Sequence, residues 1–438
     1  MHPEPDPTNP DDVDGVDDVN AAPDPDIDAQ ALEPSDDVLA ETDDDQDDTD
    51  DPDDAAFDPR RLVIGEFADF DPPDLTTASQ PSTPQPTEPD DEVRVPTPAE
   101  ASVAIERALF EAKRILVGQD RMIERLFVTW LARGHCLLEG APGLAKTLAA
   151  ESVATIIGGH FARIQFTPDL VPADLVGTRI YRPSTEQFDI ELGPVFANVV
   201  LADEINRAPA KVQSALLEVM AERQVSIGGV THRVPAPFIV LATQNPIESE
   251  GVYPLPEAQR DRFAMKVLVD YPTAREEAEI VRRMGSHPPK ARNVLQPAQL
   301  RALQTAADDV FVHDAVLDYA VRLVMATRHP AQHGLGDIDG LIANGGSPRA
   351  TLALIATGRA LALMRGRGYL LPTDVYDVAR DVLRHRVLLS FDALADGVTA
   401  EEVVERIVTT VPAPRVSPGQ DGPVVERSPM ATPEPVGS

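Results

Sequence analysis

Residues 135–150, HCLLEGAPGLAKTLAA, combine an apolar run, a glycine-bearing loop and the start of a helical pattern. The loop nearly matches the phosphate-binding pattern G-x-x-x-x-G-K-[ST], with Lys146 and Thr147 in place but Ala145 where that pattern has its second glycine. Such loops bind phosphate through backbone N–H groups at a helix N-terminus, a lysine and a hydroxyl that holds Mg²⁺. Ala145 lies where the loop becomes helix, and the loop tolerates its Cβ if the local φ is negative. Taken alone, such a loose match is weak evidence, and the alternative is a glycine-containing turn followed by an ordinary surface lysine.

Two further apolar runs end in polar residues that suit the same chemistry. VVLADEINR (199–207) delivers Asp203 and Glu204 at the carboxyl end of a predicted strand, the edge at which open α/β sheets hold ligands. Asp203 would hold Mg²⁺, and Glu204 would orient the attacking water. FIVLATQNP (238–246) places Asn245 where it could contact the γ-phosphate or that water. In isolation the acids suit a solvated strand end and the Asn-Pro a turn, but three such strand ends in one series favour a nucleotide site.

The elements that position these residues follow from hydrophobic periodicity. Short runs that are apolar on both faces predict a parallel sheet covered by helices on each side. After about residue 272 the pattern becomes helical, and the Pro and Gly residues between 330 and 346 indicate a long flexible connection. The fold class is therefore an α/β base followed by a helical lid. The predicted strands are 135–139, 162–166, 199–203, 238–243 and 265–269, and the predicted lid helices are 274–284, 297–310, 314–328, 348–366 and 373–387.

Charge divides the chain into domains. Residues 1–100 carry 33 Asp and Glu against three Arg, a net charge of −30, so residues 101–438 carry only −5 of the total −35. We expect residues 1–98 to be a disordered acidic tail, in which 63–70 is the best candidate for a docking motif. The base then spans 99–272, the lid spans 273–411, and a Pro-rich tail spans 412–438.

Several classes of protein are disfavoured. The chain opens without a secretory signal pattern, and no apolar run approaches the roughly 18 residues of a membrane span. The single cysteine, Cys136, permits no internal disulfide and sits in an apolar strand pattern. We expect a cytoplasmic protein. The acidic balance lacks the footprint of a nucleic-acid binder, although Arg365, Arg367, Arg384 and Arg386 could form a local basic patch for a DNA-acting motor.

Several motifs in one order resemble the MoxR group of AAA+ ATPases over roughly residues 100–390, and GAPGLAKT is close to the form that group uses. The resemblance implies an AAA+ base with a lid, and ATP and Mg²⁺ as cofactors. It also implies hydrolysis at the interfaces between the subunits of a ring, which we expect to be a hexamer. It also implies that Lys146, Glu204 and Asn245 are catalytic and that Thr147 and Asp203 hold the metal. The matching motifs are GAPGLAKT (140–147), RIQFTPDLVPADLVGT (163–178), VVLADEINRAP (199–209), ATQNPIESEGVYPLPEAQRDRF (242–263), GGSPRA (345–350) and LRHRV (383–387).

The resemblance also assigns the remaining nucleotide contacts. Arg349, in SPRA, would reach back to the γ-phosphate as the second sensor, and Arg262, in DRF, would act as the arginine finger in the neighbouring subunit's site. Arg260, two residues earlier, is the competing candidate for the finger. A salt-bridged turn and an ordinary helix start are the structural alternatives for these two motifs. The other implied contacts are Val117, Gly118 and Gln119 for adenine and Gly140, Ala141, Pro142, Gly143, Leu144 and Ala145 for the phosphates.

Two insertions bear on the output of the protein. Residues 178–197 predict a two-stranded insertion, and 223–237 predict a hairpin that turns at Gly228-Gly229. We expect no paired aromatic residues of the kind that grip a threaded polypeptide, so remodelling of a bound partner is favoured. The resemblance implies a homo-oligomer and a client, possible metal or cofactor insertion or complex assembly, and a partner with a von Willebrand factor A domain. The alternative is a nucleotide-gated scaffold with negligible turnover. During hydrolysis, lid and base are expected to change their angle.

Overall fold

The computed structural model describes residues 93–246, 251–285 and 288–415. The predicted acidic tail lies outside these residues up to position 92, including the candidate docking motif at 63–70, and the predicted C-terminal tail lies outside them from position 416. The first described helix is α1 (Pro98–Ile115). It begins where the sequence favours a start, because the Thr97 hydroxyl accepts from the N–H of Glu100 and Pro98 occupies the first helical position.

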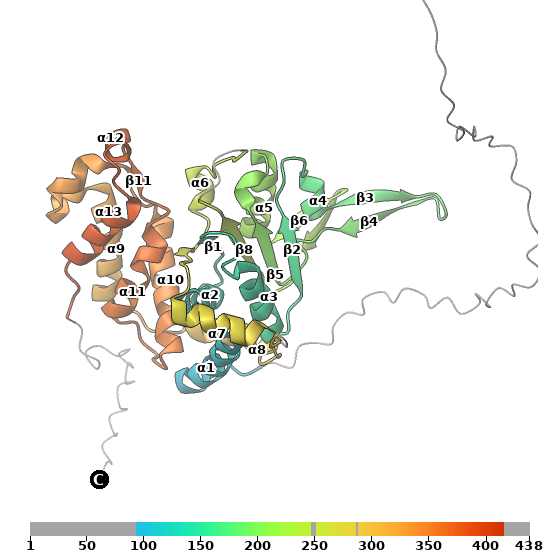
Figure 1. Cartoon of the computed structure of the whole chain (residues 1–438), viewed down its shortest axis with the longest axis horizontal. Coiled ribbons are helices and arrows are strands. Elements are labelled where there is room, and N and C mark those ends of the chain that lie inside the picture. The colour runs from blue at the N-terminus through green and yellow to red at the C-terminus, as the bar shows by residue number, and fades with distance from the viewer. Residues whose placement is uncertain (1–92, 247–250, 286–287, 416–438) are drawn as a thin grey trace, which may run out of the picture. The chain divides into compact units, whose positions relative to one another are not determined.

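A five-stranded parallel sheet forms the centre of the base, in the order β2-β5-β8-β1-β9 (Figure 1). Each strand falls on one of the five predicted apolar runs, so the predicted parallel sheet is confirmed. Because the strands are parallel, their carboxyl ends share one edge, which is where the polar residues of the motifs lie. The strands are β1 (Cys136–Glu139), β2 (Phe161–Gln165), β5 (Val199–Asp203), β8 (Ile239–Gln244) and β9 (Met265–Leu268).

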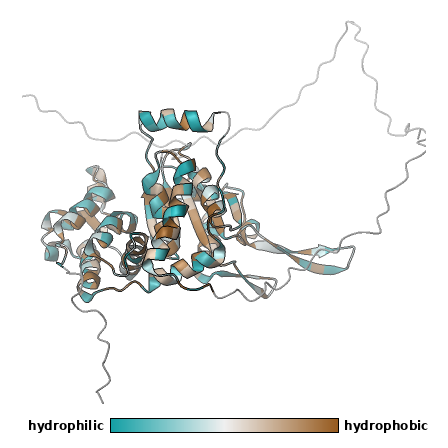
Figure 2. Cartoon of the chain, turned by 90° about the horizontal axis from the view of Figure 1, so that it is seen from below, coloured by the Kyte–Doolittle hydropathy of each residue, from teal (hydrophilic) through white to brown (hydrophobic). Residues whose placement is uncertain are grey.

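Helices cover both faces of this sheet, as Figure 2 shows by the brown strands enclosed among mixed helices. Leu138 and Leu201 pack with α1, α2 and α3 on one face, whereas Leu137 and Val200 pack with α5 on the other. Cys136 is fully buried, and its burial raises the pKa of the thiol. The remaining base helices are α2 (Asp120–Leu131), α3 (Lys146–Ile156), α4 (Pro172–Val176), η2 (Ile205–Arg207), α5 (Ala210–Glu222) and α6 (Glu257–Arg260).

The chain after β9 is mainly helical, as predicted. The helix α7 has no buried residue among its eleven, whereas α8 packs against α1, α2 and α10. Within the described residues, no helix is long and apolar enough to cross a membrane. The helices are α7 (Ala274–Met284), α8 (Pro297–Asp308), α9 (Asp314–Arg328), α10 (Pro348–Met364), α11 (Pro372–Leu383), α12 (Phe391–Ala395) and α13 (Ala400–Thr410).

Two details of the predicted lid are wrong. The connection at 330–346 contains the 3-10 helices η3 (Pro330–His333) and η4 (Gly336–Leu341) and the strand β10 (Ile342–Asn344), which pairs with β11 (Leu388–Leu389). It is ordered because Leu335 and Ile338 are buried in the core. The helix predicted over 373–387 ends at Leu383, and the three residues that follow form a turn whose side chains contact the base.

Both predicted insertions are hairpins. β3 (Gly177–Arg182) pairs with β4 (Gln187–Leu192) in a ribbon that projects from the base (Figure 1), and β6 (Gln224–Ile227) pairs with β7 (Val230–Arg233) across Gly228-Gly229. The positive φ of both glycines suits the tight turn. The prediction that paired aromatics are absent is wrong: Tyr181 faces Phe188 across the ribbon, with ring centroids 5.1 Å apart and both side chains about half exposed. Residues seven apart in sequence become neighbours only once the hairpin register is fixed.

Candidate functional site

The glycine-bearing loop joins the carboxyl end of β1 to the N-terminus of α3. Gly140 fits closely against the sheet, since a Cβ there would lie 2.5 Å from the carbonyl oxygen of Val269. At Gly143, by contrast, no heavy atom of the described residues would approach a Cβ within 4 Å, so the space beside the loop is open. Lys146 Nζ donates to the carbonyl oxygen of Gly140 at 2.6 Å, and this hydrogen bond links the last residues of the loop to its first residue.

Ala145 adopts a left-handed conformation, with φ 58° and ψ 22°. The condition of a negative φ is therefore not met, and this position has the conformation that glycine adopts most easily. The alanine is held there because Leu144 packs into the core on one side and the first turn of α3 begins at Lys146 on the other. Alanine therefore replaces the glycine of the generic loop pattern at position 145, but the backbone there remains left-handed.

This strain predicts that Ala145→Gly stabilises the protein. Removing the Cβ relieves a cost of roughly 1–2 kcal/mol, of which part is offset by the greater freedom of glycine in the unfolded chain, for a net gain of about 1 kcal/mol. The measurement is the urea midpoint of the full chain. Ala149→Gly, in the interior of α3, is the matched control and should lose stability instead. A destabilised Ala145→Gly would contradict the strain.

Asp203 lies at the end of β5 with both carboxylate oxygens engaged. Its Oδ1 accepts from the Thr243 hydroxyl at 2.6 Å, and its Oδ2 accepts from Arg163 Nη2 at 2.7 Å. Burial lowers the pKa of Lys146, while the charges of Asp203, Glu204 and Glu139 partly offset this effect. Asp203 and Glu204 are therefore close enough to Lys146 for their charges to stabilise its ammonium group.

Glu204 follows β5 in a left-handed conformation, with φ 55° and ψ 50°. Its backbone N–H donates to Thr243 Oγ1 at 2.8 Å, and its carboxylate accepts from Gln165 Nε2 at 2.9 Å and pairs with Arg207 at 3.0 Å. Strained backbone of this kind persists only where surrounding contacts impose it. The neighbouring strands thus fix both the backbone and the carboxylate of the residue expected to polarise water.

The Gln165 contact predicts a measurable restraint on hydrolysis. Gln165→Ala removes a hydrogen bond to the carboxylate of Glu204, and bonds to charged groups contribute about 1.5–3 kcal/mol. We expect turnover of ATP by the full chain to rise by up to about tenfold while ATP affinity stays the same. Gln299→Ala, which removes a glutamine of α8 that accepts from the backbone N–H of Gln296, is the control. A fall in turnover would show that Gln165 supports Glu204 instead of restraining it.

The segment assigned to adenine and the catalytic candidate Asn245 flank the loop. Gln119 is buried and its Nε2 donates to the carbonyl oxygen of Asp270 at 3.1 Å, which ties the Val117–Gln119 segment to the end of β9. A Cβ at Gly118 would lie 2.9 Å from the side chain of Glu276, so the first turn of α7 covers this segment. Asn245 follows β8, the strand next to β1, and is 7% exposed.

These residues fit a magnesium nucleotide. Open space beside Gly143, backbone N–H groups at the start of α3 and the Lys146 ammonium suit a triphosphate. Thr147 and Asp203 are oxygen donors of the type that Mg²⁺ prefers. Asp203 Oδ1 accepts one hydrogen bond and keeps a lone pair, whereas Oδ2 accepts from both Nε and Nη2 of Arg163. The structure thus brings together Lys146, Thr147, Asp203, Glu204 and Asn245 at one edge of the sheet.

The arginines lie elsewhere. Arg262 Nη1 donates to the carbonyl oxygen of Leu217, and Arg349 Nη1 lies 3.7 Å from Asp261 Oδ2. Asp261 precedes β9, so Asp261 and the arginines around it lie at the amino-terminal ends of the strands. The length of β9, about 10 Å, separates them from the edge of the sheet that carries the loop. That placement does not support the expectation that Arg349 reaches the phosphates of its own chain. Arg260 borders the same group, and its buried Nε has no partner among the described residues.

Three residues that shape the site were not predicted: Arg163, Gln165 and Thr243. Arg163 and Gln165 are two residues apart on β2, an edge strand. The side chain of Arg163 contacts Asp203, and the side chain of Gln165 contacts Glu204. Thr243 is a hydroxyl in an otherwise apolar buried strand, and it bridges Asp203 and Glu204. A polar residue inside a fully buried strand is the signal that would have pointed to it.

Comparison with known proteins agrees with this geometry. The profile of the "ATPase family associated with various cellular activities (AAA)" matches residues 135–265, and that of the AAA lid domain matches residues 337–407. "Chaperone MoxR1" of Mycobacterium tuberculosis is 60% identical over 313 residues, which cover 72% of this chain and 83% of that protein. The chain belongs to the MoxR family of AAA+ ATPases.

Other relatives support the same family. "Protein MoxR" of Methylorubrum extorquens is 32% identical over 72% of this chain and 96% of that protein. The crystal structure of a candidate ATPase from Cytophaga hutchinsonii shares 42% identity with a TM-score of 0.68, covering 72% of this chain and 96% of that one. The MoxR-type base and lid predicted from the sequence are thereby confirmed, and ATPase activity is a trait of the family.

Proposed function

We propose that this protein hydrolyses ATP with Mg²⁺ at the loop edge of the sheet. The observation that carries the proposal is the convergence of Lys146, Asp203 and Glu204 from two strand ends. Lys146 and the backbone of the loop would bind the phosphates, and Thr147 with Asp203 would hold the metal, which supplies charge neutralisation when bound. Glu204, whose backbone is fixed by Thr243, would orient and polarise the attacking water when its carboxylate leaves Gln165.

Phosphate release by the full chain tests this function. With MgATP the unaltered protein should turn over, whereas Glu204→Gln should retain ATP affinity within about threefold and lose at least about 100-fold in turnover. Lys146→Ala should lose nucleotide binding as well. The alternative, a nucleotide-gated scaffold, predicts ATP binding with no turnover by the unaltered protein and no further effect of Glu204→Gln.

The placement of the arginines favours a site completed by a second copy. Arg260, Arg262 and Arg349 gather on the opposite side of the sheet from the loop, which supports a role at the nucleotide of an adjacent chain instead of their own. An arginine supplied in trans would stabilise the charge on the transferring phosphoryl group. A heterologous contact of this kind forms a closed ring where the rotation between copies closes, and we propose such a ring of six copies.

The output we propose is remodelling of a client protein. The projecting ribbon with its exposed Tyr181 and Phe188 offers a surface for an apolar segment of such a client. A partner with a von Willebrand factor A domain, a role in metal or cofactor insertion or in complex assembly, and a cytoplasmic location belong to the same proposal and rest on the family. "Chaperone MoxR1" carries this kind of role in its name.

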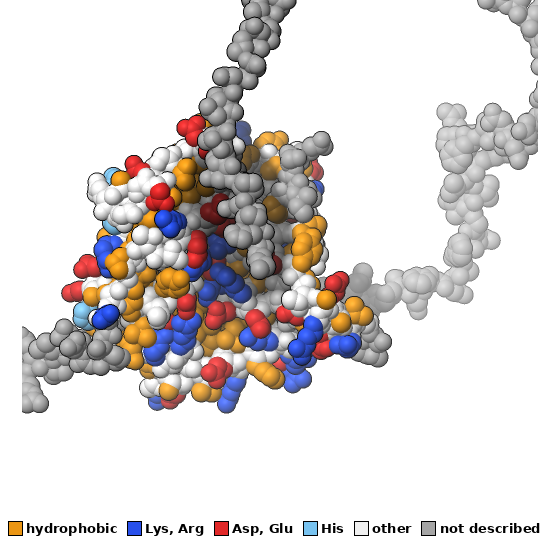
Figure 3. Space-filling view, turned by 60° about the vertical axis from the view of Figure 1, so that its left-hand side comes forward, with side chains coloured by type: hydrophobic (Ala, Val, Ile, Leu, Met, Phe, Trp, Pro, Cys, Tyr) orange, Lys and Arg blue, Asp and Glu red, His pale blue; other side chains and the backbone are white. Residues whose placement is uncertain are grey.

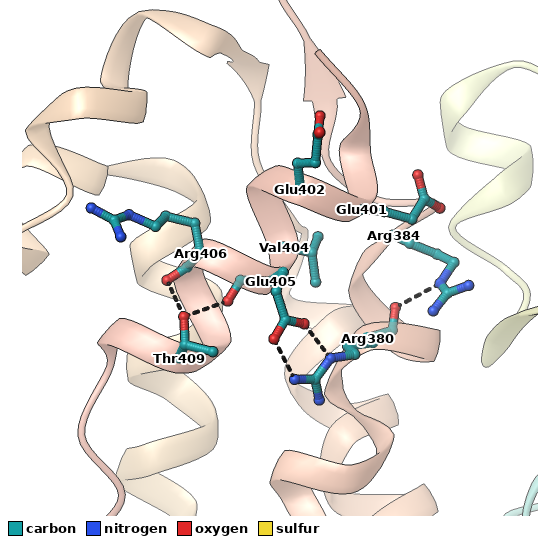
Figure 4. Close-up of a pocket in the computed structure, with 8 residues that line it drawn as sticks. All are labelled: Arg380, Arg384, Glu401, Glu402, Val404, Glu405, Arg406 and Thr409. Carbon is teal, nitrogen blue, oxygen red and sulfur yellow. Dashed lines mark hydrogen bonds and ion pairs between the residues drawn. The ribbon is translucent and has the colours of Figure 1, made fainter.

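The structure disfavours the DNA-acting alternative. Each of the four arginines of the suspected basic patch is engaged in an ion pair: Arg365 with Asp374 and Asp377, Arg367 with Asp374, Arg384 with Asp381, and Arg386 with Asp261. Figure 3 shows blue and red side chains interspersed on one face of the molecule instead of a uniform basic surface. In the lid, a cavity of about 580 Å³ is lined by both signs of charge, with Arg380 bound to Glu405 (Figure 4). Nucleic acid needs uncompensated cations.

A further inference from the structure

The turn that carries Arg260 and Arg262 is fastened to the lid through the carboxylate between them. Asp261 Oδ1 accepts from Arg386 Nε at 2.8 Å, and Asp261 Oδ2 accepts from the Ser347 hydroxyl at 2.7 Å. The same Oδ2 lies 3.7 Å from Arg349 Nη1. One carboxylate of the base therefore binds three side chains that come from two separate parts of the lid.

Backbone contacts reinforce the junction. Arg386, whose side chain is 2% exposed, donates through Nη2 to the carbonyl oxygen of Phe263 at 2.6 Å and through Nη1 to that of Ala264 at 3.2 Å. His385 Nε2 lies 3.0 Å from the same Phe263 oxygen, and burial keeps the pKa of this imidazole well below its usual range. Neutral His385 thus donates to the turn without adding another positive charge.

Charge makes Asp261 indispensable to this arrangement. Arg260, Arg349 and Arg386 line a cavity of about 300 Å³ together with only two carboxylates, those of Glu257 and Asp261. Guanidinium groups gathered this closely repel one another unless a carboxylate lies among them. Ser347 adds direction, because its hydroxyl also accepts from the N–H of Arg349 and so caps α10.

We infer that Asp261 is a positioning residue. It holds the Arg349 side chain directly, and by fastening the turn to the lid it sets the backbone position of Arg262, so that both arginines would be presented to the nucleotide of the adjacent chain. This inference rests on the proposed function. It assigns the aspartate of the DRF motif a role that reaches the phosphates only through its arginine neighbours. The conformation of the lid in one chain would then determine how well the arginines of that chain contact the nucleotide of the next chain.

Mixtures of full-length variants test the assignment. Asp261→Ala alone should bind ATP within threefold of the unaltered chain and lose about 10- to 100-fold in turnover. Glu204→Gln chains have an inactive site of their own but an intact Asp261, so adding them in excess should restore at least a third of the turnover per Asp261→Ala chain. A merely structural loss would stay with the altered chain and would not be rescued. Asp261→Asn, which keeps one acceptor oxygen for Arg386 and turns an NH₂ group toward the Ser347 hydroxyl, should lose less than Asp261→Ala.

Two controls separate the possible failures. Glu257→Ala removes a carboxylate that lines the same cavity and accepts from Asn344 of the lid, and it should change turnover by less than twofold. Arg262→Ala is mixed with Glu204→Gln in parallel. If that mixture recovers turnover and the Asp261→Ala mixture does not, Asp261 is not a positioning residue while the proposed function stands. If neither recovers, the arrangement in trans is wrong, and this inference is wrong with it.

Discussion

Arg262→Ala should bind MgATP with unchanged affinity and lose about 10³- to 10⁵-fold in turnover, the contribution that an arginine in trans makes in related NTPases. The reason is geometric. Arg262 lies on the amino-terminal side of the sheet, where its Nη1 bonds to the carbonyl oxygen of Leu217, away from the loop that is proposed to bind the nucleotide of its own chain. Phosphate release and a fluorescent-nucleotide titration measure the two quantities.

Complementation decides whether the arginine acts between chains. Arg262→Ala retains its loop and Glu204, whereas Glu204→Gln retains its arginines, so mixed assemblies should contain complete sites and regain turnover. Arg260→Ala, treated in the same way, identifies which of the two arginines is the finger. Full turnover by Arg262→Ala alone would reject the assignment of this residue.

The second large effect concerns stability. Asp381 on α11 is fully buried and pairs with Arg125 at 2.8 Å and with Arg121 and Arg384 at 3.2 Å, which joins the lid to α2 of the base. Asp381→Ala leaves Arg125 and Arg384, each with a side chain 7% exposed, without their buried counter-charge. We expect a loss of about 3–5 kcal/mol in the free energy of unfolding. Urea denaturation of the full chain measures it.

An exposed pair of the lid provides the matched control for Asp381→Ala. Asp337 and Arg406 are 3.2 Å apart, and more than half of each side chain is exposed. Because water screens such pairs, Asp337→Ala should cost no more than about 1 kcal/mol. Equal losses in the two variants would mean that the buried cluster does not hold lid and base together.

Much of the fold was predictable because its signals are local. The five buried strands are apolar on both faces, and each predicted range overlaps the observed strand. The order of Lys146, Asp203 and Asn245 along the chain also predicted that they share one edge, since parallel strands end together. The site itself needed only the placement of strand ends, which hydrophobic runs define well.

The remainder depends on contacts between distant residues. Ser347 and Asp261 are 86 residues apart, and nothing in SPRA or DRF indicates that these motifs bind each other. The helix predicted through LRHRV stops early because Arg386 and His385 find carbonyl partners on the base. At position 145 the generic loop pattern has glycine, and the backbone is indeed left-handed there although the residue is alanine. The sequence of this chain alone does not show that the left-handed angle is kept.

The ion-paired junctions at Asp261 and Asp381 bear on how force would travel through an assembly. They join the lid to the base of the same chain at two places, so a change of the angle between lid and base would have to rearrange both ion-paired contacts. Under the proposed function, part of the free energy of each hydrolysis step would thus be spent on these two carboxylates before it reaches the seam between copies.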